Sequence, residues 1–175
     1  RIGQRVSYWK SAVGKALISG LSIDERTALL EANKSEILGN SEYDNLQQLN
    51  NHLDLVNARG YAVEIDDDIP GISGVAAPIL DHRGITVAAI SLSGSSQRLG
   101  REELHSIVPS VIEATRLASL KAGGAPRPVS SKIRPKSFPE PNFDVIYEAK
   151  NLIGEGLTLS INGQFVYWVD ICRPC

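Results

Sequence analysis

The side chains best suited to hold a small molecule occur in residues 71–95, GISGVAAPILDHRGITVAAISLSGS. Two apolar stretches are separated there by a polar break at residues 81–84, which is typical of two strands joined by a turn. Ser91 and Ser93 lie two residues apart near the end of the second stretch. Because residues i and i+2 of a strand point to the same side, we expect both hydroxyls on one face of a sheet.

A glycine completes this predicted polar face. If Leu80 pairs with Ile85 across the break, Gly74 lies opposite Ser91. A glycine beside hydroxyl groups leaves a small polar hollow, in which a ligand can come close to the backbone. The alternative is that the serines are simply satisfied at a strand edge. The arrangement predicts binding rather than catalysis.

Other residue types that could do chemistry occur in incomplete patterns. Lys15 follows a glycine in SAVGKAL, but the full phosphate-loop pattern is absent, and this lysine is expected on a helix surface. The pair Cys172 and Cys175 has no second pair and no redox-fold context. The three histidines lack metal-ligand spacing and are expected at the surface: His52, His82 and His105.

Helices followed by an antiparallel hairpin are expected around these residues. A strand is expected over residues 61–64, followed by an acidic turn at 66–68. Helices and an antiparallel sheet in this order indicate an α+β domain. Four helices are expected, and the second of them begins at the capping box formed by Ser22 and Glu25. The other three cover about residues 10–20, 44–60 and 101–121.

The composition changes after residue 123. Five of the nine prolines lie between residues 122 and 142, where apolar periodicity is absent, so a Pro-rich linker is expected over 124–142. Residues 143–175 are expected to begin a second unit. There Asn162-Gly163 predicts a hairpin turn before the aromatic strand 165–169. Such a unit cannot bury its own hydrophobic face without neighbours.

The bulk composition limits the classes of function. With 42% hydrophobic residues the chain can bury a core, and without a run of about 18 apolar residues no membrane span is expected. A net charge of −2 argues against strong nonspecific attraction to nucleic acid. Only two cysteines occur, so a cytoplasmic location is expected. The chain begins at Arg1 and lacks methionine, which indicates a piece of a longer product.

From about residue 8 to 123 the sequence resembles the effector-binding domain of IclR-type bacterial transcription regulators. The resemblance is carried by SAVGKALISGLS, LDLVNARGYAVEIDDDIPGISGVAAPILDHRG and VAAISLSGS, in this order and spacing. It implies, for residues 1–123, a GAF-like fold in which helices flank a curved antiparallel sheet. It also implies a small-metabolite ligand, often a carboxylic or aromatic acid. The helix-turn-helix domain through which such regulators bind DNA is absent from this chain, and the regulators are typically homodimers or homotetramers.

The same resemblance places an effector-binding site on six residues of this chain: Ala12, Val13, Glu64, Gly74, Ser91 and Ser93. Many relatives carry a cysteine where this chain has Gly74, which implies a larger pocket with one polar contact fewer. Glu64 would repel an anionic effector unless it is protonated or bonded to a ligand hydroxyl. On the bare sequence, Glu64 is equally consistent with a solvated residue before the acidic turn.

From about residue 143 the sequence resembles the start of the gluconolactonase/regucalcin family of six-bladed propellers. The resemblance is carried by Gly154-Glu155-Gly156 and by YWVDI at 167–171. It implies an incomplete β-propeller blade, in which Glu155 would ligate a divalent metal, calcium or zinc, only in a complete propeller. Leu157 and Leu159 stand where the family usually has proline and tryptophan. Calcium takes about 6–8 oxygen ligands, so no cofactor is expected in this chain.

Taken together, the residues and resemblances predict a metabolite-sensing domain of a bacterial transcription regulator. It would bind a small organic or sugar acid without transforming it, and would control DNA binding by the absent helix-turn-helix domain. The sugar acid is suggested by the fusion to a lactonase-like unit. One alternative is a metal-dependent sugar lactonase with a regulatory N-terminal domain. Another is a dimerisation module with an occluded pocket.

Overall fold

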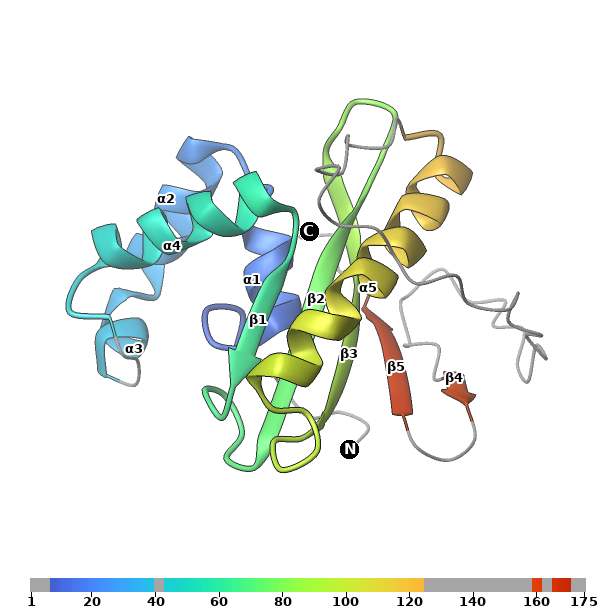
Figure 1. The fold of residues 1–175 in the computed structure, drawn as a ribbon. Helices are drawn as coiled ribbons and strands as arrows, with labels where there is room; N and C mark the ends of the chain where they lie inside the picture. The colour runs from blue at the N-terminus through green and yellow to red at the C-terminus, as the bar shows by residue number, and fades with distance from the viewer. Residues whose placement is uncertain (1–6, 40–42, 125–158, 162–164, 171–175) are drawn as a thin grey trace.

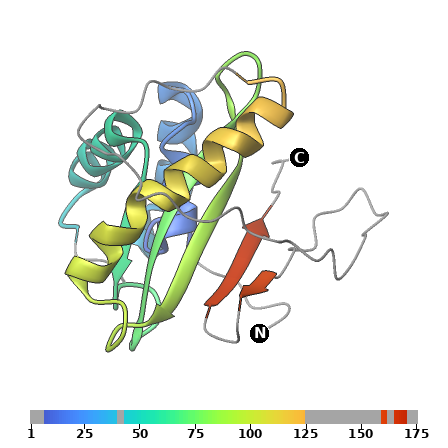
Figure 2. The ribbon, with the colours of Figure 1, turned by 45° about the vertical axis from the view of Figure 1, so that its right-hand side comes forward.

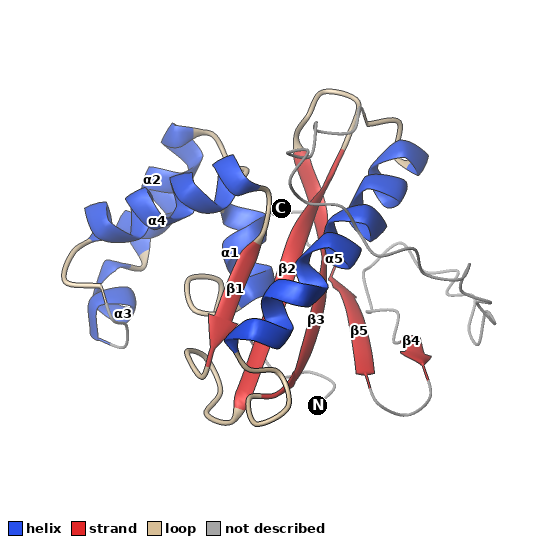
Figure 3. Ribbon diagram, viewed as in Figure 1, coloured by secondary structure: helices blue, strands red, loops and turns tan. Residues whose placement is uncertain are grey.

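Helices lie on both faces of one antiparallel sheet. The computed structural model describes residues 7–39, 43–124, 159–161 and 165–170, and its strands follow the order β1-β2-β3-β5-β4 (Figure 1). Figure 3 shows the strands flanked by helices, which confirms the α+β class and the antiparallel sheet. The elements are α1 (Ala12–Ile18), α2 (Ile23–Ala32), α3 (Lys34–Gly39), α4 (Leu46–Arg59), β1 (Ala62–Ile65), β2 (Ile72–Leu80), β3 (Thr86–Ser95), α5 (Arg101–Lys121), β4 (Leu159–Ile161) and β5 (Phe165–Asp170).

The helix boundaries follow from local capping chemistry. Ser22 and Glu25 form the predicted capping box at the start of α2, with the side chain of each accepting from the backbone of the other. Asn45 caps α4, and Gly60 ends it in the left-handed conformation, with φ of 81°. The short helix α3 was not anticipated, since only Ile37 within it is buried and no apolar periodicity marks it.

The two faces of the sheet are packed differently. The face toward α5 is apolar and contains Val75, Ala77 and Leu92 packed against Leu104 and Val108. On the face toward α1, the buried hydrophobic residues are almost all alanines. Because alanine side chains are short, the backbone of α1 lies close to the strands. The residues of this second cluster are Ala12, Ala16, Val56, Ala62, Ala76 and Ala89.

The register of the central hairpin differs from the prediction. Leu80 pairs with Thr86 rather than with Ile85, and Gly74 therefore lies opposite Ser93 rather than opposite Ser91. The prediction that Gly74 faces Ser91 is wrong, and the residue opposite Ser91 is Ala76.

Two local features cause this shift of register. Asp81 organises a wider turn than expected, because its Oδ1 accepts hydrogen bonds from the backbone N–H groups of Arg83 at 2.8 Å and Ile85 at 2.9 Å. The Asp81 N–H also donates to the Ile85 carbonyl, which places Ile85 in the turn. A β-bulge between Ile79 and Leu80 then adds one further residue to β3.

A C-terminal hairpin extends the same sheet. Strands β4 and β5 are antiparallel, as the sequence predicts, and the turn residues 162–164 lie outside the described ranges. Strand β5 pairs with β3, with Trp168 opposite Ser91 and Val166 opposite Ser93. Figure 2 shows the two strands beside β3, at the edge of the sheet. The predicted linker over 124–142 falls, apart from Gly124, on residues that are not described, and the predicted domain division stays a prediction.

The tight packing of α1 against the Tyr8 backbone can be tested by substituting Gly14. A Cβ at this position would lie 2.7 Å from the Tyr8 carbonyl oxygen and closer still to its Cα. Helix propensity alone predicts that Gly14→Ala stabilises by about 1 kcal/mol. We expect the overlap with immobile backbone to dominate, so that urea unfolding shows a loss of about 1–3 kcal/mol. Gly39→Ala, where an added Cβ meets no atom within 4 Å, is the matched control. A stabilised Gly14→Ala variant would contradict this packing.

Candidate functional site

Two adjacent rows of paired residues on the α1 face of the sheet carry three polar side chains, those of Glu64, Ser93 and Ser91. Glu64 of β1 pairs with Gly74 of β2, which pairs with Ser93 of β3. The next row contains Ala62, Ala76 and Ser91. Because directly paired residues point to the same side of a sheet, Glu64, Ser91 and Ser93 share one face. The structure thus brings together the predicted site residues on the strands, although their contact with an effector stays a prediction.

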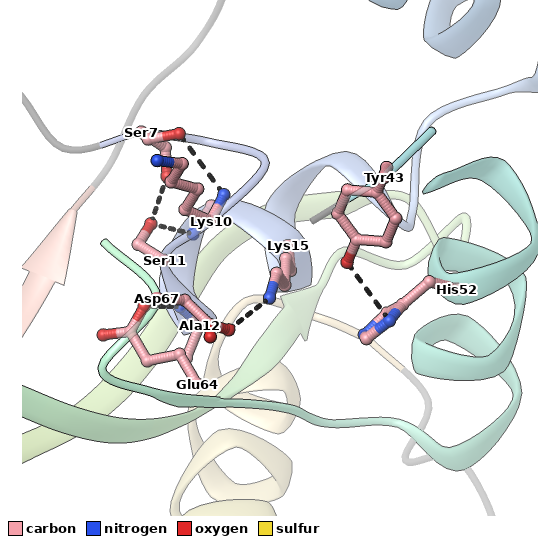
Figure 4. Close-up of polar contacts among 10 residues, drawn as sticks. Ser7, Lys10, Ser11, Ala12, Lys15, Tyr43, His52, Glu64 and Asp67 are labelled. Carbon is pink, nitrogen blue, oxygen red and sulfur yellow. Dashed lines mark hydrogen bonds and ion pairs between the residues drawn. The ribbon is translucent and has the colours of Figure 1, made fainter. Parts of the chain in front are cut away.

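A hydrogen bond from α1 joins this row to the helix. The Ala12 N–H, at the first position of α1, donates to Oε2 of Glu64 at 2.7 Å (Figure 4). The helix start is fixed by Ser11, whose Oγ accepts from the Gly14 N–H at 3.1 Å and donates to the Ser7 carbonyl at 2.6 Å. Val13, the other residue predicted on this side of the site, is partly exposed in the same helical turn.

Glu64 is buried rather than solvated. Only 8% of the residue is exposed, which excludes the alternative of a solvated residue before the turn. The pKa of Glu64 is raised to about 7, mainly by burial and also by the negative charges of Asp68 and Asp67. The Ala12 N–H and the positive charge of Lys15 lower the pKa. Glu64 therefore changes its protonation state near neutral pH.

The absence of a side chain at Gly74 lets polar atoms approach the strand backbone closely. A Cβ at Gly74 would lie 3.1 Å from Oγ of Ser93, 3.2 Å from the Leu92 carbonyl oxygen and 3.4 Å from Oε1 of Glu64, which is tight contact. Oε1 of Glu64 and the Ser93 hydroxyl therefore both lie close to the Gly74 backbone. Ser91 is 5% exposed, and among residues 7–39 and 43–124 neither serine hydroxyl has a hydrogen-bond partner.

Lys15 is buried, so the prediction that it lies on a helix surface is wrong. It is 1% exposed, and its Nζ forms an ion pair with Oδ2 of Asp67 at 3.1 Å, as Figure 4 shows. A buried ammonium group requires a partner, and the acidic turn supplies one. The ion pair holds the 66–68 turn against α1, beside Glu64.

His52 is also more enclosed than predicted. Its Nδ1 lies 3.2 Å from the Tyr43 hydroxyl, and the two rings are perpendicular (Figure 4). Burial lowers the pKa of His52 most, and the positive charges of Lys15 and Arg59 lower it further, against the negative charge of Asp67. Its position three residues after the buried Leu49 was the available signal. The other two histidines, His82 and His105, are exposed as predicted.

The predicted metal ligand, Glu155, lies outside the described residues. Within the described ranges no group of three or more acidic, histidine or cysteine side chains could hold a metal ion. A search of the described helices also finds none that is long and apolar enough to cross a membrane.

Comparison with known proteins identifies the kind of domain. The sequence matches the family profile "Bacterial transcriptional regulator IclR C-terminal" over residues 1–120. The HTH-type transcriptional regulator BhcR of Paracoccus denitrificans is 33% identical over 125 residues, which cover 71% of this chain and 44% of that protein. The HTH-type transcriptional regulator KdgR of Escherichia coli is 28% identical over 123 residues, covering 70% of this chain and 47% of that protein.

A solved structure supports the same relationship. The crystal structure of the C-terminal domain of E. coli KdgR superposes with a TM-score of 0.59 and 27% identity, over 70% of this chain and 74% of that domain. The fold is thus that of an effector-binding domain of a bacterial transcription regulator. This chain belongs to the IclR C-terminal family. It spans less than half the length of the two regulators named above.

The burial of Glu64 predicts an unusual pH dependence of stability. The folded-state pKa lies near 7, above the ordinary value of 4.5, so the folded state holds the proton more tightly. The stability gained in this way is fully present below pH 4.5 and is lost as pH rises through about 7. We expect urea unfolding to show a loss of roughly 3 kcal/mol over that window from this one group.

Glu64→Gln keeps the hydrogen-bond acceptor for the Ala12 N–H but cannot ionise, so it should reduce the dependence of the unfolding free energy on pH. The difference between the two proteins isolates Glu64 from His52, whose lowered pKa acts in the opposite direction. Glu102→Gln, an exposed position on α5, is the control and should keep the parent slope. Parallel profiles for Glu64→Gln and the parent would contradict a raised pKa.

Proposed function

We propose that this domain senses a small organic or sugar acid and controls the DNA binding of a helix-turn-helix domain in the same regulator. The supporting observation is the row formed by Glu64, Gly74 and Ser93, which lies beneath the first turn of α1. Membership of the IclR C-terminal family supports the regulatory role. The proposed contacts with the acid are made by six residues: Ala12, Val13, Glu64, Gly74, Ser91 and Ser93.

These residues offer the groups that a hydroxy acid or keto acid requires. The hydroxyls of Ser91 and Ser93 can each donate or accept a hydrogen bond, and backbone N–H groups of α1 can donate to a carboxylate. Gly74 carries no side chain, and the side-chain polar atoms closest to it are Oγ of Ser93 and Oε1 of Glu64. No group in this set resembles a nucleophile activated by a neighbouring base, so the site is suited to binding without turnover.

The position of the site supports a signalling role. A ligand lying between α1 and the sheet would contact two elements that are joined there by the Ala12–Glu64 hydrogen bond. A ligand shifts a conformational equilibrium only through different affinities for the two states. We propose that the bound and free states differ in the seating of α1, and that the regulator acts as a homodimer or homotetramer.

A metal-dependent lactonase has no support among these observations. The family profile covers residues 1–120 and does not extend to the GEG motif. Glu155 and the remainder of the GEG motif lie outside the described residues. No observation on the described part favours a metal-dependent enzyme.

Removing either serine hydroxyl should weaken binding. In isothermal titration of the full chain with gluconate, lactate and benzoate, Ser91→Ala and Ser93→Ala should each cost about 0.5–1.5 kcal/mol, which is about 2- to 13-fold in affinity. Ser106→Ala removes an exposed hydroxyl on α5 and is the control, with no expected effect. Binding that survives both serine substitutions unchanged would place the site elsewhere.

Adding a side chain at Gly74 should also weaken binding. The Cβ of Gly74→Ala would press on Oγ of Ser93 at 3.1 Å and would displace one of the proposed ligand contacts. The same titrations should show a loss of about fivefold or more, which corresponds to the lower end of overpacking costs. Gly74→Val should abolish binding. Gly39→Ala is the control, and tighter binding by Gly74→Ala would refute the placement of the site beside Gly74.

A further inference from the structure

We propose that the helical part of this domain turns against the sheet about Gly60, and that three carboxylates at the end of β1 form the latch that holds the two parts together. The helical lobe is defined as α1–α4, within residues 7–59, and the sheet lobe as β1–β3 with α5, within 61–124. The inference goes beyond the proposed function, because it concerns the chain without a ligand. Either one can therefore fail while the other stands.

Each lobe has a hydrophobic core of its own. In the helical lobe, Trp9 and Ile18 pack with Leu30 of α2 and Leu49 of α4 in one buried cluster. Among the described residues this cluster contains none from the strands or from α5. The core of the sheet lobe lies between the strands and α5, and none of its described members comes from α1–α4. Each lobe is therefore held together by side chains that do not depend on the other lobe.

The lobes meet through small side chains. The alanine cluster described above supplies the apolar contact between them, with Val56 as its one larger buried member. Each alanine buries a single methyl group, so the cluster stabilises less than the larger side chains within either core. Gly20 adds a close approach to Thr86 without a side chain of its own. Apolar packing alone thus holds the lobes together more weakly than it holds either lobe.

The chain crosses from one lobe to the other at Gly60. This residue ends α4 with φ of 81°, and an added Cβ there would meet no atom within 4 Å. A glycine in open surroundings leaves the backbone free to change its dihedral angles, as a hinge requires. Figure 1 shows α2, α3 and α4 to one side of the strands, with α1 between them and the sheet. A rotation about Gly60 would move the four helices together.

Three polar contacts join the lobes away from this hinge, and each ends on a carboxylate within residues 64–68. They are the Ala12 N–H to Oε2 of Glu64 at 2.7 Å, Nζ of Lys15 to Oδ2 of Asp67 at 3.1 Å, and the Ser7 N–H to Oδ2 of Asp68 at 3.4 Å. The three carboxylates, here called the acidic latch, reach three points along residues 7–15. Opening of the latch would separate the Ala12 amide from Glu64, the two sides of the proposed site.

The acidic latch is fixed to the sheet lobe. Oδ1 of Asp66 accepts from the Gly71 N–H at 2.7 Å, which closes the turn within itself. The Ser96 N–H, just after β3, donates to the Gly71 carbonyl at 2.9 Å. The turn is therefore braced against β2 and β3, and its carboxylates stay with the sheet when the helical lobe turns.

The ion pair between Lys15 and Asp67 is the strongest part of the latch. The side chain of Lys15 is 1% exposed and that of Asp67 is 31% exposed. Opposite charges about 4 Å apart, at the effective dielectric constant of a protein surface, favour the closed state on the order of a thousandfold. Solvent at Asp67 reduces this factor. Without the Asp67 charge the buried ammonium is unpaired, and opening brings it to water. We expect the open population to rise about tenfold or more.

Residue-resolved amide hydrogen exchange of the full chain, followed by NMR at one fixed pH, tests the latch. The Ala12 N–H crosses between the lobes, whereas the Lys15 N–H donates within the helical lobe at 2.9 Å and the Leu104 N–H within the sheet lobe at 3.0 Å. Exchange of a protected amide follows the population of the open state. In Asp67→Asn the Ala12 amide should therefore exchange about tenfold faster or more, while the other two keep the parent rate.

Asp66→Asn is the matched control. It removes the same charge one residue away, keeps Oδ1 for the Gly71 amide, and places asparagine where φ is 58°, a conformation that asparagine tolerates. All three amides should keep the parent rate. If Asp67→Asn fails to fold, Lys15→Gln removes the other charge of the pair and should speed Ala12 exchange in the same way. The double variant should exchange no faster than the faster single one, because both break one interaction.

Each contrary result overturns the proposal. An Ala12 amide at the parent rate in Asp67→Asn, or equally fast in Asp66→Asn, shows that the ion pair is not the latch. Faster exchange of the Ala12 and Lys15 amides together shows that α1 unravels instead of turning with its lobe. Equal acceleration of the Leu104 amide shows that the whole domain unfolds and that no separate hinge motion exists. No ligand enters these measurements, so the proposed function is decided separately by its own titrations.

Discussion

The short distance between α1 and the sheet is the constraint on which the rest of the site depends. Ala12 and Ala16 pack on Ala62, Ala76 and Ala89, so no large side chain separates the helix from the strands. This approach allows a carboxyl group on β1 to reach the first amide of α1, 52 residues earlier in the chain. It also buries Lys15 against the turn that follows β1. A larger residue at any of these alanines would lift α1 and separate the two halves of the site.

The two faces of the sheet differ in the groups that they bury, and burial of ionisable groups makes the α1 side the less favourable one. The α5 side is closed by branched and aliphatic residues such as Val75, Leu92 and Leu104, and its burial stabilises the domain without further conditions. The α1 side buries two ionisable groups instead. Lys15 is matched by a carboxylate, whereas the one hydrogen bond to Glu64 within the described part is a single backbone amide. That inequality explains why burial raises the pKa of Glu64 to about 7.

Local chemistry made much of the fold predictable, and tertiary contacts account for the errors. Caps such as Ser22 and Gly60 act within a few residues, so the predicted helix boundaries agree with the structure. The predicted register was wrong because Asp81 binds two amides and widens the turn, which the residue types in the break do not reveal. Lys15 was misplaced because its partner, Asp67, is distant in sequence. The shared face of Ser91 and Ser93 was predictable, since strand alternation does not depend on register.

The packing around α1 also indicates how ligand binding at the site would change the positions of other elements in the domain. Ile18 of α1 lies in the same core cluster as Leu49 and Leu53 of α4, while Val56 of α4 contacts the alanine cluster. Helix α1 is therefore wedged between the sheet and α4, and any ligand that competes for the Ala12 amide acts on both contacts. Closely packed elements shift as units rather than deform gradually. Under the proposed function, a change in the seating of α1 would move α4 relative to the sheet, whereas α5, packed on the opposite face, would stay in place.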